Sequence, residues 1–417
     1  MRKFKLFRWQ GSSKIYTLPF LKNRVKLASD SEEILTYAKC PFTRSRFVMH
    51  MISEFHLSQN SIVVSDDSHA KWLKRLSLRH MPTYLKTPAI AKDLMERTFA
   101  IEEDGNNEQI TQISERLIRE LYRTMLSKVL NVSVLKPLDD FISKTKFPKG
   151  SRPLAIEGLM YSFRLHLPFL RPIRWFFDTI FFRETRNMKR VSKKLEQMIF
   201  DYTIPNEDSW FKELSELKDA KKITDAQFKG EITSMLVSSF SLASALGSTL
   251  LCLAARPSYQ KKIHKDPTFA KYFVMEVLRL NPPFRQFGYD RTNLDKSKNR
   301  SSGVESEFMI PVVELHRNSS NWKDPNKFYP ERFLEPNSTK GFKYIPFGMG
   351  KRSCPGRKFS LSLITDSVEF VCSDESSIDL VKRNKMPQGV TGRLVSFAID
   401  DTLAYRKKKA LQMEDPM

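Results

Sequence analysis

Glycine and cysteine are scarce in this chain, and both shortages narrow the choice of fold. The 417 residues include 14 glycines and show no fixed-period repeat, which argues against barrels, propellers and solenoids. The four cysteines, Cys40, Cys252, Cys354 and Cys372, lie far apart and form no Cys-x-x-Cys pair. The sequence therefore indicates neither a zinc site nor a disulfide framework. We expect a mainly helical protein in a reducing compartment, and we predict a cytoplasmic location.

Long apolar runs and acidic residues are also in short supply. No run of 18 or more apolar residues occurs, and the opening MRKFKLFRWQ has no apolar signal-peptide core, so we expect no transmembrane segment. Peripheral membrane contact stays open. Lys and Arg number 70 against 47 Asp and Glu, a net charge of +23 that favours acidic partners. Because this charge is spread along the chain without a recognisable reading helix or aromatic platform, we expect no nucleic-acid partner.

The hydrophobic and aromatic content, 41% and 12%, is typical of a globular protein, and we predict a single domain over residues 1–417. Apolar periodicity and breakers predict two short strands within 14–28 and a long helix over about 225–255, roughly 45 Å long, that ends before Pro257. Further helices are predicted at about 110–130, 134–145, 183–204 and 357–372. Terminal strands are expected within 378–399, followed by a solvated tail from residue 406.

One cysteine stands where a metal ligand would need it, in the stretch FGMGKRSCPG at 347–356. A thiolate is the species that ligates metals, and a helix N-terminus favours it. Pro355 suits a first helical position after Cys354. Gly350 and Gly356 would let the backbone turn tightly and approach a flat cofactor, and Arg352 supplies a cation for a carboxylate beside the thiolate. The alternative is a buried cysteine beside a turn.

This stretch resembles the haem-ligand loop of the cytochrome P450 family, because Phe347, Gly350, Arg352, Cys354 and Gly356 match the five fixed positions of its pattern. The resemblance implies a mainly α fold with small β-sheets, of the soluble bacterial type. It also implies haem b (iron protoporphyrin IX) between the long central helix and the helix that follows the Cys loop. Cys354 would then be the axial iron ligand.

A second set of motifs lies within 266–356. Glu276 and Arg279 are one helical turn apart and can pair on one face. In the resembled family an arginine at the place of Arg332, in the run YPERF, completes a buried network with such a pair. The role of Glu276, Arg279 and Arg332 would be structural.

Other basic residues correspond to positions where the family binds haem propionates. Arg291 and Arg352 stand at two such places, and His69 and Arg75, in the basic stretch 65–81, lie near a third. The stretch departs from the family's spacing, since Leu73 rather than an arginine follows His69 by four residues. A solvated basic face for His69 and Arg75, and an exposed loop arginine for Arg291, are the alternatives.

The long central helix departs from the family at its most characteristic pair. Phe240 and Ser241 stand where most members have an acid followed by a threonine, and no Asp or Glu occurs from Ile232 through Lys265. The serines at 234, 238, 241, 244 and 248 fall on one face. They indicate either close packing or a face laid against the cofactor. Ser241 would keep the alcohol, while the acid is absent.

The resemblance implies a monooxygenase that inserts one oxygen atom from dioxygen into a small or medium apolar substrate. No Gly-x-Gly-x-x-Gly follows a strand, so electrons would come from a separate acidic ferredoxin or flavodoxin-like donor. The aromatic stretch 154–182 is expected to be a lid, a membrane-contacting surface or plain core. Three alternatives stay open: use of peroxide, a rearrangement without dioxygen, and haem binding without catalysis.

Overall fold

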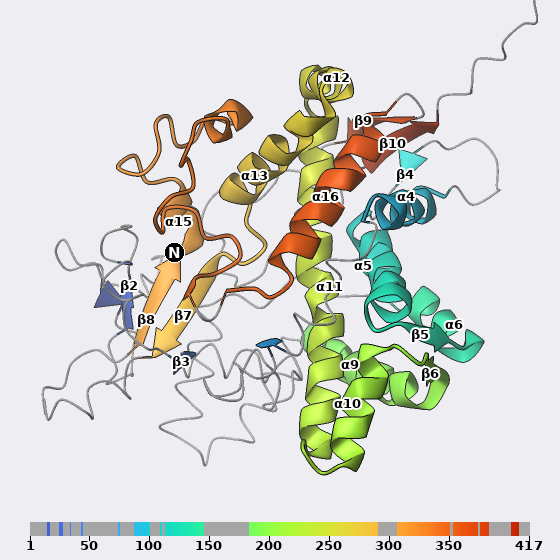
Figure 1. Ribbon diagram of the computed structural model, residues 1–417. Coiled ribbons are helices and arrows are strands. Elements are labelled where there is room, and N and C mark those ends of the chain that lie inside the picture. Colours follow the sequence, from blue (N-terminus) through green and yellow to red (C-terminus); the bar gives the residue numbers. More distant parts are fainter. Residues whose placement is uncertain are drawn as a thin grey trace, which may run out of the picture.

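The computed structural model describes residues 15–16, 25–27, 34, 43–44, 74–75, 87–100, 109–110, 113–145, 183–290, 307–350, 353–373, 376–382 and 402–407. These residues form mostly helices, with small sheets at two sides of the helical part (Figure 1). The predicted fold class, mainly α with small sheets, is confirmed. The aromatic stretch 154–182, and most of the basic stretch 65–81, lie outside the described residues.

Helices supply most of the described structure, and five of them fall close to the predicted ranges. Their bounds are α4 Thr87–Thr98, α5 Ile113–Thr124, α6 Lys136–Lys144, α9 Arg183–Tyr202, α10 Trp210–Asp219, α11 Asp225–Ala254, α12 Pro257–Lys265, α13 Ala270–Leu280, α15 Val312–His316 and α16 Arg357–Val371. Shorter turns are a π-helical η1 Met125–Val129, which continues α5, and the 3-10 helices η3 Pro267–Phe269 and η5 Pro330–Phe333.

The long central helix α11 begins and ends at signals that the sequence carries. Thr224 caps its first turn, accepting from the Gln227 amide while the Gln227 side chain accepts from the Thr224 amide, which is a capping box. Pro257 follows its end. By length and composition alone α11 could span a membrane, but 88% of its most apolar window is buried inside the protein. It is therefore packed as a core helix.

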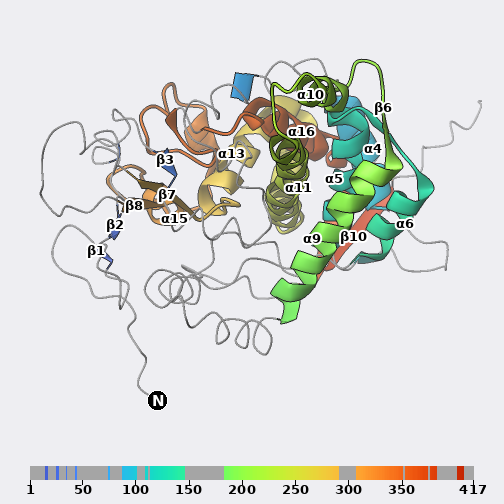
Figure 2. The same cartoon turned by 90° about the horizontal axis from the view of Figure 1, so that it is seen from below.

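The main hydrophobic core surrounds α11. Helices α5, α10, α13 and α16 contact it directly, and α4 packs on α16. Viewed from below, α11 is seen almost end-on between these neighbours (Figure 2). A smaller apolar cluster, with Ile310, Leu315, Ile345 and Met349, joins the sheet to the segment that leads to Cys354.

The largest sheet joins the N-terminal part of the chain to its middle. Its order is β1-β2-β8-β7-β3, with β1 Ile15–Tyr16, β2 Val25–Leu27, β8 Glu307–Pro311, β7 Gln286–Asp290 and β3 Thr43–Arg44. The β2–β8 pair is parallel and the other pairs are antiparallel. The two strands expected within 14–28 are confirmed as β1 and β2.

Two smaller sheets complete the described β-structure. One has the order β4-β10-β9, with β4 Gln109–Ile110, β10 Thr402–Lys407 and β9 Ser376–Lys382, and the other pairs β5 Val132–Val134 with β6 Thr203–Pro205. The prediction of a solvated tail from residue 406 is wrong at its start. Arg406 and Lys407 belong to β10, where they pair with Ser377 and Ser376.

Candidate functional site

The loop before Cys354 folds back on itself through short hydrogen bonds. The Cys354 amide donates to the Phe347 carbonyl at 2.8 Å, and the Ser353 amide donates to the Gly350 carbonyl at 3.1 Å. Gly348 and Gly350 have φ of +72° and +57°, in the left-handed region that favours glycine. Gly350 thus has the backbone conformation that the predicted tight turn requires. Gly356, the N-cap of α16, has an ordinary φ of −80°, so its part in a close approach to a cofactor stays a prediction.

Cys354 is the exposed thiol among the described cysteines. Cys252 and Cys372 are 8% and 5% exposed, whereas Cys354 is exposed directly before the N-terminus of α16. Burial raises the pKa of the Cys372 thiol to about 12, so that thiol stays protonated. Helix α16 begins at Arg357 rather than at Pro355, because residues 355–356 form a turn. The helix dipole still points its positive end at the Cys354 region, which favours a thiolate.

Lys74 contacts the Cys loop and was missed by sequence reasoning. Its Nζ donates to the carbonyl and to Oγ of Ser353, at 2.9 and 3.0 Å. A cation is therefore held next to the residue that precedes the candidate ligand. Arg75, the neighbour that the sequence singled out, is exposed, and its propionate role stays a prediction. The only sequence signal for Lys74 was its place in the basic stretch.

Three predicted propionate-binding residues, His69, Arg291 and Arg352, lie outside the described residues. Their roles therefore stay predictions. Phe347 is described, and its ring lies 5.9 Å from the guanidinium of Arg357 at the start of α16.

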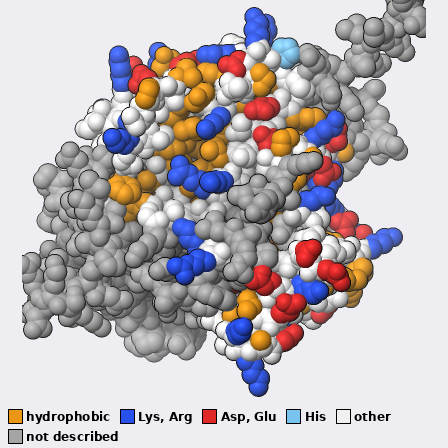
Figure 3. Space-filling model, viewed as in Figure 1, with side chains coloured by type: hydrophobic (Ala, Val, Ile, Leu, Met, Phe, Trp, Pro, Cys, Tyr) orange, Lys and Arg blue, Asp and Glu red, His pale blue; other side chains and the backbone are white. Residues whose placement is uncertain are grey.

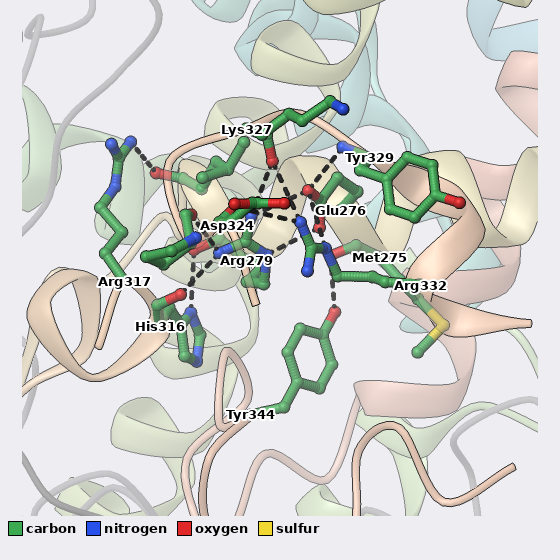
Figure 4. A network of polar contacts seen from close by, with 12 residues as sticks. Met275, Glu276, Arg279, His316, Arg317, Asp324, Lys327, Tyr329, Arg332 and Tyr344 are labelled. Carbon is green, nitrogen blue, oxygen red and sulfur yellow. Dashed lines mark hydrogen bonds and ion pairs between the residues drawn. The ribbon is translucent and has the colours of Figure 1, made fainter. Parts of the chain in front are cut away.

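The predicted network of Glu276, Arg279 and Arg332 is confirmed (Figure 4). Glu276 and Arg279 are fully buried on α13, and Arg279 donates from Nε and Nη2 to the two carboxylate oxygens at 2.7 and 2.8 Å. Arg332 of η5 adds a third bond, from its Nε to Oε1 at 3.3 Å, and the Tyr329 amide donates to the same oxygen at 2.8 Å. The single carboxylate thus accepts four bonds.

Further guanidinium protons of this network go to backbone carbonyls. Arg279 donates to the carbonyls of His316, Pro325 and Lys327 at 2.6, 2.7 and 3.2 Å. Arg332 donates to those of Lys323, Asp324 and Lys327, at 2.8, 3.3 and 3.2 Å. Because buried charges are costly unless they are paired and hydrogen-bonded, this arrangement fixes the segment 316–332 on α13. That segment leads into the Cys loop, which agrees with a structural role.

Phe240 and Ser241 of α11 have different surroundings. Phe240 is 6% exposed, and its ring meets the Tyr122 ring of α5 edge-on, with centroids 5.8 Å apart. It therefore packs α11 against α5. Ser241 is half-buried and donates its hydroxyl to the Ser238 carbonyl at 2.8 Å, within the same helix. The buried serines at 234, 244 and 248 agree with close packing of α11.

The surroundings of Cys354 are compatible with a thiolate that ligates a metal carried by a cofactor. No group of three or more His, Cys, Asp or Glu side chains that could hold a metal is found in the part of the chain that the structure describes. A lone thiolate can be the fifth ligand to an iron whose four other ligands are porphyrin nitrogens. The exposed thiol, the helix N-terminus and the glycine turn are all compatible with a porphyrin over Cys354.

Comparisons with known proteins agree with this interpretation. A family model described as "Cytochrome P450" matches residues 155–364, about half of the chain. Trans-cinnamate 4-monooxygenase of Ruta graveolens is 27% identical over 291 residues, which cover 60% of this chain and 54% of that protein. Cytochrome P450 3A15 of Cavia porcellus is 27% identical over 267 residues, covering 55% and 51%. The chain spans about half the length of these curated relatives. It belongs to the cytochrome P450 family.

Proposed function

We propose that this chain belongs to a haem-thiolate monooxygenase in which Cys354 is the axial ligand of haem b. The observation that carries the proposal is the exposed Cys354 thiol, held before the N-terminus of α16 by the Phe347 carbonyl. Membership of the cytochrome P450 family and the buried Glu276 network support it. When bound, the haem supplies the activation of dioxygen, and a thiolate ligand favours cleavage of the O–O bond.

The residues of this chain would hold and orient the reacting groups. Cys354 would supply a negatively charged ligand to the haem iron, and Lys74 donates to the carbonyl of the neighbouring Ser353. Ser241 of α11 is the hydroxyl that we assign to proton delivery, together with ordered water. Its present acceptor is the Ser238 carbonyl. Arg352, Arg291, His69 and Arg75 stay our candidates for the propionates.

The electron donor proposed is a separate acidic protein of the ferredoxin or flavodoxin type. Arg357 and Lys358, which follow Cys354 closely in the sequence, are exposed, and so is Arg75, the neighbour of Lys74. The first turn of α16 has no acidic residue. Lys and Arg side chains are spread over the described part of the face in Figure 3. Such charge attracts an acidic partner, and this attraction weakens with salt. Reduction of the haem that does not depend on ionic strength would contradict this part of the proposal.

The substrate class proposed is a small or medium apolar organic molecule. The relative from Ruta graveolens is named a trans-cinnamate 4-monooxygenase, which shows that a relative of this chain oxygenates an aromatic substrate. We propose the same class of reaction here, in the cytoplasm, on a substrate that the described residues do not identify further.

A second candidate function rests on Phe240. A phenyl ring cannot relay protons, and Phe240 is packed against Tyr122, at the place where most members have an acid. The protein would then use peroxide, or rearrange an already oxidised substrate without dioxygen. A haem protein without catalytic activity is the remaining alternative.

Turnover separates these functions. The haem-containing protein is supplied with a panel of apolar aromatic substrates, first with a reductase and dioxygen and then with peroxide alone. Oxygenated product that depends on dioxygen and electrons supports the monooxygenase. Product with peroxide alone supports the second function, and the Cys354→Ala variant is the control that must abolish either activity. If none of these reactions yields a product, the proposal of an enzyme that acts on this substrate class is contradicted.

A further inference from the structure

The last carbonyls of α13, including those of Arg279 and Leu280, have no backbone donor from the residues that follow the helix. The Arg279 carbonyl would accept from the amide of residue 283, but Pro283 has no N–H. His316 fills this place, with Nδ1 3.0 Å from the Arg279 carbonyl. Arg317 donates in the same way from Nη2 to the Leu280 carbonyl at 3.1 Å. Two adjacent side chains of the α15 region therefore cap α13.

The second nitrogen of His316 extends this cap to the segment before the Cys loop. The Ile345 amide donates to His316 Nε2 at 2.9 Å. Since Nε2 accepts, Nδ1 must carry the proton that is donated to the Arg279 carbonyl, and this fixes one neutral tautomer. The ring is therefore a two-sided connector between α13 and Ile345.

Tyr344 reinforces the same attachment. Its ring stacks on His316, with centroids 5.4 Å apart and an interplanar angle of 22°. Its hydroxyl donates to the Met275 carbonyl at 3.0 Å, and Met275 lies one turn before Arg279 on α13. Figure 4 shows Tyr344 and His316 reaching the same helix. Residues 344–345 are thus held at two neighbouring points of the helix that also carries Glu276.

The Cys loop starts directly from this anchored pair. The Gly348 amide donates to the Ile345 carbonyl at 3.0 Å, and the Phe347 carbonyl accepts the Cys354 amide. A shift of Ile345 would therefore be passed to the turn that positions Cys354. His316 is fully buried, and burial, with the charges of Arg279 and Arg317, lowers its pKa to about 3. The neutral ring that the two hydrogen bonds require is present at physiological pH.

We propose that His316 is a positioning residue for the iron ligand: it connects the end of α13 to Ile345 and so sets the place of the loop that carries Cys354. This inference rests on the proposed role of Cys354 in haem ligation. It adds a residue whose described hydrogen bonds go to α13 and to Ile345 rather than to Cys354. The two ring nitrogens have separate tasks, so they can be tested separately.

The test compares three variants of the full chain in its haem-bound form. In His316→Asn the amide nitrogen can replace Nδ1, while the acceptor for the Ile345 amide is lost. In His316→Gln the amide oxygen can reach the position of Nε2 and keep that acceptor. Arg317→Gln is the matched control, because it removes the neighbouring cap on Leu280 and has no bond to residues 344–345.

Two readouts follow the loop itself. Hydrogen exchange reports the Ile345 amide, and the spectrum of the reduced carbon monoxide complex reports the fraction of haem with a thiolate ligand. We expect His316→Asn to speed Ile345 exchange at least tenfold and to lower the thiolate fraction. His316→Gln should stay near the wild type in both readouts. Arg317→Gln should lower the melting temperature without changing either. Equal effects of Asn and Gln, or unchanged Ile345 exchange in the Asn variant, would overturn the inference.

A measurement on the wild type keeps the inference testable if a variant does not fold. Selective ¹⁵N labelling of histidine, in the diamagnetic ferrous carbonyl form, should show His316 protonated at Nδ1 from pH 5 to pH 8. Protonation at Nε2, or titration near 6.5, would overturn the inference. Without any thiolate band in the wild type the proposed function fails, whereas the Ile345 exchange still decides whether His316 anchors this segment.

Discussion

Replacing Glu276 by Gln keeps the shape of the side chain and removes the only negative charge in a buried network. Glu276 accepts from two nitrogens of Arg279, from Arg332 and from the Tyr329 amide. A glutamine has one acceptor oxygen, so its NH₂ group would face a guanidinium donor. The change therefore leaves two buried cations uncompensated and at least one donor without an acceptor.

The expected cost follows from these contacts. Breaking a buried ion pair by removing one partner costs about 3–5 kcal/mol. A hydrogen bond to a charged group contributes about 1.5–3 kcal/mol, so the loss of the two short Arg279 bonds alone gives a similar figure. We therefore expect Glu276→Gln to lower the free energy of unfolding by about 3–5 kcal/mol, a large share of the roughly 5–15 kcal/mol of a typical protein.

The assay is urea unfolding followed by far-ultraviolet circular dichroism, with Glu331→Gln as the matched control. Glu331 lies beside Arg332 and pairs with Lys262 at 2.7 Å, but the two side chains are 22% and 42% exposed. An exposed pair contributes about 0–1 kcal/mol, so the control should change stability by no more than that. If Glu276→Gln were no more destabilising than Glu331→Gln, the buried network would not contribute the stability expected from its contacts.

Other predictions concern α11 and His316. Phe240→Ala should lower the free energy of unfolding by about 3–5 kcal/mol in urea titration, because it leaves a cavity against Tyr122; a loss below ~1 kcal/mol would contradict its packing role. Ser241→Ala should change stability by less than about 1 kcal/mol, since the hydroxyl donates only to its own helix among the bonds described, yet slow dioxygen-dependent turnover by roughly 10²-fold; unchanged turnover would remove Ser241 from proton delivery. The pKa of His316 falls from 6.5 to about 3 on folding, so the unfolded chain binds the extra proton, and stability is constant above pH 6.5 and declines as pH falls toward 3. Between pH 6.5 and 5 the free energy of unfolding should fall by about 2 kcal/mol more in the wild type than in His316→Gln. Equal pH dependence of the two proteins would contradict this prediction.

Local signals in the sequence were sufficient for the elements that carry the site. The break at Pro257 predicted the end of α11 because the effect of a proline acts within one turn, whereas the capping box at Thr224 was seen only in the structure. Glu276 and Arg279 share a helix face, so their spacing indicated that they can pair, and the structure shows that they do. Arg332, 56 residues from Glu276, could be placed beside them only through the resemblance to a known family.

Contacts between distant segments escaped the sequence. The bond from Lys74 to Ser353 joins residues 279 positions apart, and His316 reaches α13 across 37 positions. Periodicity reports which face of an element is buried, but not which other element buries it. For the same reason the sequence showed only that Phe240 stands in place of an acid, while its packing on Tyr122 became visible only in the structure. Terminal strands were predicted within 378–399, but β10 lies beyond that range at Thr402–Lys407, where it pairs with β4 and β9 from two different parts of the chain.

The most direct test of the account is the absorption spectrum of the purified protein, reduced and exposed to carbon monoxide. We predict the band of a thiolate-ligated haem in the wild type and its loss in Cys354→Ala, with the Cys372→Ala variant unchanged because that buried thiol stays protonated. A colourless protein made with ample porphyrin, an imidazole-type band, or a spectrum that Cys354→Ala leaves unaltered would contradict the assignment of Cys354 as the iron ligand.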